Sequence, residues 1–262
     1  MGIVMTQGGS TLGDYALGPA PKTGVRLFLK GDTRYLDLLR RAFPVPASWY
    51  GPYDSFAAQF DYVLYAQGIE DRALASYLDM AKQTLLIPST LDECWALSHH
   101  MAPEGRSEVG QLVYDAKTYA NKLGRRDAAE RLCEIFSERF AAHSAVGRCD
   151  VVTSVPANPP KEGHDLPELL ARATADRHGQ RFDQGLLTKD YPTPQVKDLP
   201  NDEKAGALVG AFSVTRSLTG ASIVVVDDVV RSGTTLGHIA AVLREAGAAD
   251  VIGLVATKTM RD

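Results

Sequence analysis

The stretch that decides the fold reads ASIVVVDDVVRSGTTL and covers residues 221–236. It opens with a short apolar run rich in β-branched residues, which predicts a strand buried on both faces of a parallel sheet. The run leads into Asp227 and Asp228 and then into a loop of small residues, where Gly233 permits a tight turn. Residues 235–246 have the pattern of a helix, with Thr234 in its first turn. The stretch therefore predicts a strand with an acidic end, a turn and a helix.

This arrangement also indicates a kind of ligand. Backbone N–H groups at the start of a helix form an anion site, and the hydroxyl groups of Ser232, Thr234 and Thr235 add further donors. The two carboxylates beside this site are unsuited to hold phosphate, but they suit sugar hydroxyls or a divalent metal ion. Phosphate, diol and metal together describe a sugar phosphate.

The second half of the chain alternates between helices and strands. Helical patterns cover residues 108–123, 126–143 and 166–178, and strand patterns cover residues 148–155, 182–187 and 249–257. Strands that alternate with helices predict a parallel sheet with right-handed crossovers. The expected fold class is α/β, with a parallel sheet flanked by helices.

The first half carries no recognisable chemical motif. A short strand is expected at residues 25–29, and helices are expected at residues 34–42, 55–68, 70–86 and 90–100. We therefore expect two parts: a mostly helical N-terminal region over residues 1–105, as a hood or accessory domain, and an α/β domain over residues 106–262.

Composition sets the class of protein. The 262 residues carry a formal net charge of -4, with 45% hydrophobic and 23% charged residues, as in ordinary globular proteins. The near-neutral balance gives no general basic field, so charge does not indicate nucleic-acid binding. No apolar run is long enough for a transmembrane helix, and the N-terminus lacks the pattern of a secretory signal, so cytoplasmic residence is expected.

The three cysteines, Cys94, Cys133 and Cys149, include no Cys-x-x-Cys pair. The sequence therefore excludes a zinc ribbon and argues against a disulfide framework. Cys133 and Cys149 fit core positions.

Residues 221–236 resemble the signature for 5-phosphoribosyl-1-pyrophosphate (PRPP) in the type I phosphoribosyltransferases. In that family a hydrophobic strand leads into two acidic residues and a loop of the form T/S-G-x-T. The resemblance implies that Asp227 and Asp228 are the catalytic residues, which bind the ribose hydroxyls and hold Mg²⁺ through its water shell. It also implies a PRPP-binding set formed by Val229, Val230, Arg231, Ser232, Gly233, Thr234 and Thr235.

Residues 106–260 resemble most closely the ComF-type phosphoribosyltransferases, although the zinc ribbon of that group is missing. The matching features are VP at residues 155–156, TPQ at 193–195, GAF at 210–212 and AGA at 246–248. Residues 162–165 read EGHD where the group has Arg-Gly-Phe-Asn, so the arginine of that segment is absent.

The resemblance places pyrophosphate at the loop after the first core strand, with Ala157, Asn158 and Lys161 as ligands. A rigid proline-rich connector is an equally good interpretation of this loop. The polar segment at residues 188–204 resembles the lid that closes over PRPP, with Lys189, Lys197 and Lys204 as solvated or ligand-binding lysines.

The activity implied by the resemblance is transfer of the 5-phosphoribosyl group from PRPP to a nitrogen atom of a small-molecule acceptor, with release of pyrophosphate. The expected partners are PRPP, the acceptor and the cofactor Mg²⁺, with no membrane, and a homodimer is compatible with the resemblance. The alternative is a non-catalytic PRPP-sensing or DNA-uptake-type accessory protein, which the missing arginine favours.

Overall fold

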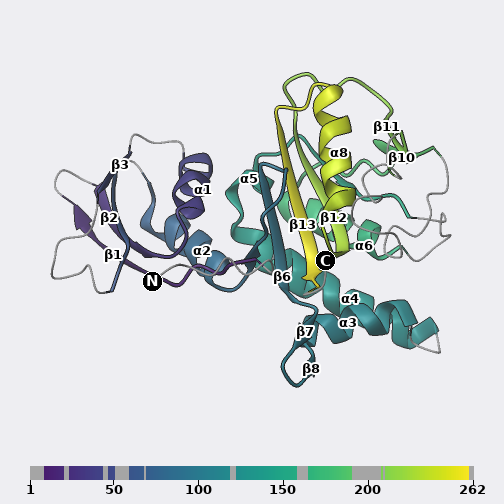
Figure 1. Ribbon diagram of the computed structural model, residues 1–262, viewed down its shortest axis with the longest axis horizontal. Coiled ribbons are helices and arrows are strands. Elements are labelled where there is room, and N and C mark those ends of the chain that lie inside the picture. The colour runs from purple at the N-terminus through teal and green to yellow at the C-terminus, as the bar shows by residue number, and fades with distance from the viewer. Residues whose placement is uncertain are drawn as a thin grey trace.

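The structure is a computed structural model that describes residues 9–20, 24–43, 47–50, 59–67, 69–118, 122–157, 165–190, 208 and 210–259. Figure 1 shows two parts, a small sheet with two helices at the N-terminal end and a larger sheet covered by helices. The larger sheet carries Asp227 and Asp228 toward the carboxyl end of one of its strands.

The larger sheet has five strands in the order β5-β6-β13-β12-β9. β6 (Glu93–His99), β13 (Asp250–Lys258), β12 (Ser222–Val230) and β9 (Val151–Ser154) are parallel, whereas the short β5 (Leu85–Leu86) pairs antiparallel at the edge. The parallel α/β fold expected from the sequence is confirmed, with β12 next to the middle strand.

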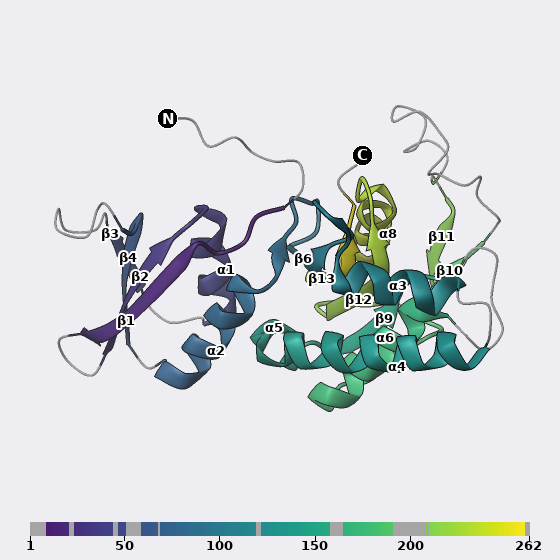
Figure 2. The same cartoon turned by 90° about the horizontal axis from the view of Figure 1, so that it is seen from below.

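Helices cover both faces of this sheet. α3 (Glu108–Thr118), α4 (Lys122–Arg139) and α6 (Leu166–His178) lie on one face, side by side in Figure 2, and α8 (Thr234–Glu245) packs on the other. Val224 and Val226 of β12 belong to the core on the α3–α6 face, and Val225 belongs to the core on the α8 face. The strand is therefore buried on both sides, as its apolar run predicted.

Shorter elements complete the fold around the larger sheet. They are β7 (Met101–Ala102), β8 (Gly105–Arg106), η1 (Phe140–Ala142), α5 (Ser144–Gly147), β10 (Leu187–Lys189) and β11 (Phe212–Val214).

The N-terminal region is not mostly helical, so that prediction is wrong for the described residues. It contains an antiparallel sheet in the order β1-β2-β4-β3, formed by β1 (Asp14–Ala20), β2 (Gly24–Lys30), β4 (Tyr62–Gln67) and β3 (Ala47–Tyr50). Its helices are α1 (Arg34–Ala42), as predicted, and α2 (Asp71–Lys82). The helix expected at residues 55–68 is instead β4 over its described second half, because a short apolar run has no periodicity that separates strand from helix.

The helix expected at residues 90–100 is also wrong, because this segment forms strand β6 of the central sheet. The first five residues of β6 are all buried, which removes the alternation that marks a half-exposed strand. Because β5 and β6 precede residue 106, the central sheet includes strands from before the expected boundary between the two parts.

Trp95 of β6 joins the cores of the two parts. Its side chain is fully buried, and its ring packs 6.1 Å from that of Tyr35 on α1 and 6.5 Å from that of Tyr77 on α2, between centroids. Its indole N–H donates to the Glu93 carboxylate at 3.0 Å, and this carboxylate also lies 3.1 Å from His143 Nε2. Burial of these rings makes the N-terminal region continuous with the core of the larger sheet.

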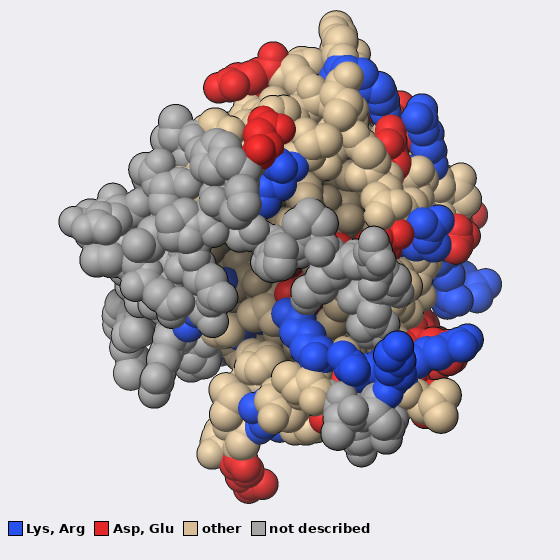
Figure 3. Space-filling view, turned by 90° about the vertical axis from the view of Figure 1, so that its right-hand side faces the viewer, with Lys and Arg blue, Asp and Glu red and all other residues tan. Residues whose placement is uncertain are grey.

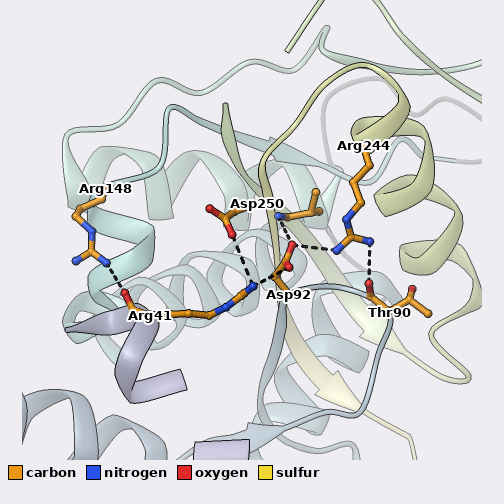
Figure 4. Close-up of polar contacts among 7 residues, drawn as sticks. Arg41, Thr90, Asp92, Arg148, Arg244 and Asp250 are labelled. Carbon is orange, nitrogen blue, oxygen red and sulfur yellow. Dashed lines mark hydrogen bonds and ion pairs between the residues drawn. The ribbon is translucent and has the colours of Figure 1, made fainter. Parts of the chain in front are cut away.

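An ion-pair network also links the N-terminal region to the larger sheet, at the amino ends of its parallel strands. Figure 4 shows Arg41 from α1 and Arg244 from α8 reaching Asp92, each 2.9 Å from a different carboxylate oxygen. Burial opposes ionisation of Asp92, but the Val251 N–H and both guanidinium groups hold the pKa of Asp92 below its usual value. Because the Asp92 carboxylate is partly buried and engaged on both oxygens, the network orients α1 against the sheet more firmly than an exposed pair would.

Candidate functional site

The acidic pair, Asp227 and Asp228, lies within strand β12 at its carboxyl end. Hydrogen bonding to β13 continues past both residues to Val230, so the strand is longer than the apolar run alone indicated. Asp228 is 9% exposed and Asp227 is half-buried. Successive strand residues point to opposite faces of a sheet, so the two side chains diverge from adjacent positions. Val229 and Val230 pack their side chains into the cores on either face, which leaves only their backbone for a ligand.

The loop after β12 is short and leads directly into α8. Gly233 has φ +81°, the left-handed conformation that glycine adopts without strain, and its carbonyl accepts the first helical hydrogen bond from Gly237. Ser232 Oγ lies 2.8 Å from Thr234 Oγ1. The N–H groups from Ser232 to Thr235 have no hydrogen-bond acceptor within the described ranges. A helix start with unsatisfied donors is a site for an anion.

Lys117, at the end of α3, forms an ion pair with one member of the acidic pair. Its Nζ lies 2.5 Å from Asp228 Oδ2, and its side chain is 36% exposed. No sequence signal indicates this residue, because it lies on a helix far along the chain and meets Asp228 only through packing. His100 also belongs to this region, with Nδ1 3.1 Å from Thr257 Oγ1, and burial together with Arg106 and Lys117 lowers the pKa of His100.

The two carboxyl groups differ in their electrostatic surroundings. Desolvation of the Asp227 carboxyl, followed by repulsion from Asp228, raises the pKa of Asp227 to about 7. The Asp228 N–H, which donates to Asp227 Oδ1 at 2.8 Å, and Lys117 act in the opposite direction, whereas Asp165 adds to the rise. A carboxyl group with this pKa is poised to ionise when a cation or hydroxyl donors arrive.

The raised pKa of Asp227 predicts a loss of stability as pH rises. Between the usual aspartate pKa of 3.8 and about 7, the folded protein binds more protons than the unfolded chain, so the free energy of unfolding falls across this window and stays low above it. Asp227→Asn is expected to remove about 1–2 kcal/mol of this fall, since each pKa unit is worth ~1.4 kcal/mol and partial exposure reduces the effect. Urea unfolding at pH 5 and pH 8 measures it.

The matched control for this measurement is Asp176→Asn, which changes an exposed carboxylate at the end of α6. It should keep the pH dependence of the wild type. If the free energy of unfolding changed equally between pH 5 and pH 8 in the wild type and in Asp227→Asn, Asp227 would have its usual pKa in the folded protein.

Strand β9 ends beside the acidic pair. Its register matches Ser154 to Val226, and the Val155 N–H donates to the Val226 carbonyl at 2.9 Å, so the loop after β9 starts level with Asp227. Ala157 lies in this loop and is half-buried, which places one predicted pyrophosphate ligand near the site.

Most of the other predicted ligands lie outside the described residues, namely Asn158, Lys161, Lys197 and Lys204. Lys189 is in β10, its Nζ 5.4 Å from the centre of the Phe212 ring.

A basic face adjoins the end of α3. In Figure 3, Lys and Arg side chains form a band across the lower part of the view, at the level of α3 and α4 in Figure 1. Lys117 of α3 and Lys122 and Arg126 of α4 are exposed.

The three cysteines are free thiols, with Cys94 and Cys149 buried and Cys133 partly buried. In the described part of the chain no three His, Cys, Asp or Glu side chains converge to hold a metal ion. No described helix has the length and apolar character needed to span a bilayer.

Comparison with known proteins shows what parts of this chain resemble. Residues 170–259 match the family model described as "Phosphoribosyl transferase domain". The chain is 30% identical over 176 residues to amidophosphoribosyltransferase 2 of Arabidopsis thaliana, and 31% identical over 156 residues to the Glycine max amidophosphoribosyltransferase. These alignments cover 64% and 57% of this chain, but only 28% and 24% of the relatives, so the chain spans about a quarter of their length.

Among solved structures, the glutamine PRPP amidotransferase of B. subtilis is 21% identical, with a TM-score of 0.39, and the alignment covers 89% of this chain and 46% of that one. A purine phosphoribosyltransferase of Pyrococcus horikoshii is 13% identical, with a TM-score of 0.32 and coverage of 51% and 84%. None of these relatives is of the ComF type, and that closer resemblance stays a prediction. The chain is therefore similar to the phosphoribosyl transferase family over residues 170–259, and to the amidophosphoribosyltransferases over about a quarter of their length.

Proposed function

We propose that the protein binds PRPP and transfers its phosphoribosyl group to a nitrogen acceptor with release of pyrophosphate. The observation that carries this proposal is the junction of β12 and α8, where two adjacent carboxylates stand beside four unsatisfied backbone N–H groups of the described loop. The amides and hydroxyls of the loop suit the 5′-phosphate, and Asp227 and Asp228 suit the ribose hydroxyls.

The proposed reaction forms no covalent bond between the protein and the substrate. The lone pair of the acceptor nitrogen forms a bond to the ribose anomeric carbon, the bond from that carbon to the pyrophosphate oxygen breaks with its electrons, and the nitrogen then loses a proton. Positive charge develops on the sugar in the transition state, where the carboxylates of the acidic pair stabilise it. Fixing the phosphate and the ribose aligns the anomeric carbon with the acceptor.

The residues present fit a magnesium ion that shares its ligands with the substrate. Asp227 and Asp228 offer oxygen ligands, but the described part of the chain brings no third carboxylate to them, so PRPP and water would complete the shell. When bound, Mg²⁺ would neutralise charge on the leaving pyrophosphate. The loop from β9 to α6, with Ala157, Asn158 and Lys161, is proposed to receive that pyrophosphate.

The acceptor is proposed to be a small nitrogen compound. The names of the curated relatives favour an amide-derived nitrogen, whereas the purine phosphoribosyltransferase among the similar structures has a name that points to a base. Fold similarity does not choose between them, because acceptor specificity depends on contacts outside the shared core.

The test is release of pyrophosphate from PRPP and Mg²⁺ with ammonium, glutamine, purine bases and pyrimidine bases as acceptors. We expect acceptor-dependent release that the double variant Asp227→Asn/Asp228→Asn lacks. PRPP binding without release on any acceptor would support the alternative of a PRPP-sensing or DNA-uptake-type accessory protein. Absence of PRPP binding by the folded protein would overturn both.

A further inference from the structure

Lys117 is the one described residue whose side chain forms an ion pair with the acidic pair. The Asp228 side chain is only 12% exposed, so its carboxylate has little access to water, and the ammonium group at 2.5 Å supplies its counter-charge. At this distance the ammonium group occupies space beside Oδ2 that a directly bound cation would need.

The position of Lys117 is set by how α3 docks on the sheet. The Ser107 hydroxyl donates to the His99 carbonyl at 2.6 Å and accepts the Gly110 N–H at 2.9 Å, which ties the first turn of α3 to the end of β6. Val113 and Ala116 are buried against the sheet. The helix therefore projects Lys117 over the carboxyl end of β12 as a fixed consequence of packing, rather than as a freely moving surface lysine.

The neighbouring basic groups do not take this role. Lys258 is buried and its Nζ donates to the carbonyls of Arg231 and Thr259 at 2.8 and 2.7 Å. Arg106 lies over the Tyr114 ring, with its guanidinium carbon 3.7 Å from the centroid. Lys117 differs from Lys258 because its side chain is partly solvent-accessible, and from Arg106 because its charged group contacts the acidic pair, so its ammonium group has room to turn toward an incoming anion.

On the basis of the proposed function, we propose that Lys117 fills the cation position beside Asp228 in the free protein and moves to the diphosphate when PRPP binds. Even when both carboxyl groups are ionised, two carboxylates paired with one ammonium group carry no more than a single net negative charge, and the described residues supply no third acidic ligand. Such a pair attracts a free divalent ion weakly. The metal ion is then bound only together with PRPP, whose oxygen atoms complete its shell and whose diphosphate draws the ammonium group away.

The test measures binding of Mn²⁺, a paramagnetic substitute for Mg²⁺, to the protein without PRPP. Lys117→Met and Lys117→Gln are expected to raise Mn²⁺ affinity at least ~10-fold over wild type, because the competing charge is gone. Lys117→Arg should keep the weak binding of the wild type. The matched control is Lys122→Met, which removes an exposed lysine of the next helix and should change nothing.

A second measurement separates this inference from the proposed function. Calorimetric titration with PRPP at saturating Mn²⁺ should show binding to wild type, and binding at least ~10-fold weaker to Lys117→Met. If the wild type binds PRPP but the Lys117→Met and Lys117→Gln variants bind Mn²⁺ no more tightly than the wild type, the role of Lys117 is overturned and the proposed function stands. Failure of the wild type to bind PRPP would overturn the proposed function and the inference with it.

Discussion

Replacing both members of the acidic pair, Asp227→Asn together with Asp228→Asn, is expected to abolish PRPP binding while the protein stays folded. Each carboxylate accepts hydrogen bonds from ribose hydroxyls in the proposed complex, and a hydrogen bond to a charged group contributes about 1.5–3 kcal/mol. Losing both should weaken binding by at least ~100-fold, or ~3 kcal/mol. Calorimetric titration with PRPP and Mg²⁺ measures the change.

The fold should tolerate this double variant because asparagine keeps the shape of aspartate and carries no charge, which removes the desolvation and the repulsion from Asp228 that raise the pKa of Asp227. A thermal melt provides the check on folding, and Asp176→Asn is the control for the loss of a carboxylate elsewhere. Unchanged PRPP affinity in the folded double variant would show that the sugar binds at another place.

The largest expected effect on stability is that of Gly110→Ala. A Cβ atom at this position would lie 2.1 Å from the backbone carbonyl oxygen of His100, which is far inside contact distance, and neither backbone has a flexible end that can move away. Helix α3 would have to shift away from the end of β6, with a loss of about 2–3 kcal/mol by overpacking. Chemical denaturation at pH 7 measures the loss.

The matched control for Gly110→Ala is Gly147→Ala. Gly147 is an exposed residue of α5, and the nearest atom to its added Cβ would be His178 Nδ1 at an ordinary 3.5 Å. Alanine there should leave stability unchanged or raise it slightly, because glycine is the more flexible residue in the unfolded chain. Equal stabilities for the Gly110→Ala variant and the wild type would mean that α3 is not held closely against β6.

The parts of the molecule that the sequence predicts correctly are those whose signals are local. Residues 221–236 indicate β12, the acidic pair and the start of α8, because strand, turn and helix each leave a pattern within a few residues. The same holds for α1, whose buried residues Tyr35, Leu38, Leu39 and Ala42 recur at helical spacing.

Other features depend on contacts between distant residues, and the sequence does not predict them. The buried positions of β6 run continuously and carry no strand alternation, so only its pairing with β13 distinguishes it from a helix. Lys117 is similar, since it lies far from Asp228 along the chain and meets it only after α3 has docked. A lysine near the end of a helix carries no local sign of its partner.

The most direct test of the proposed PRPP site is a crystal structure of the protein with PRPP and Mg²⁺. We expect the 5′-phosphate on the backbone N–H groups between Ser232 and Thr235, with the ribose hydroxyls on Asp227 and Asp228 at the carboxyl end of β12. A structure in which PRPP binds elsewhere, with these amides and carboxylates free of the ligand, would contradict the proposal.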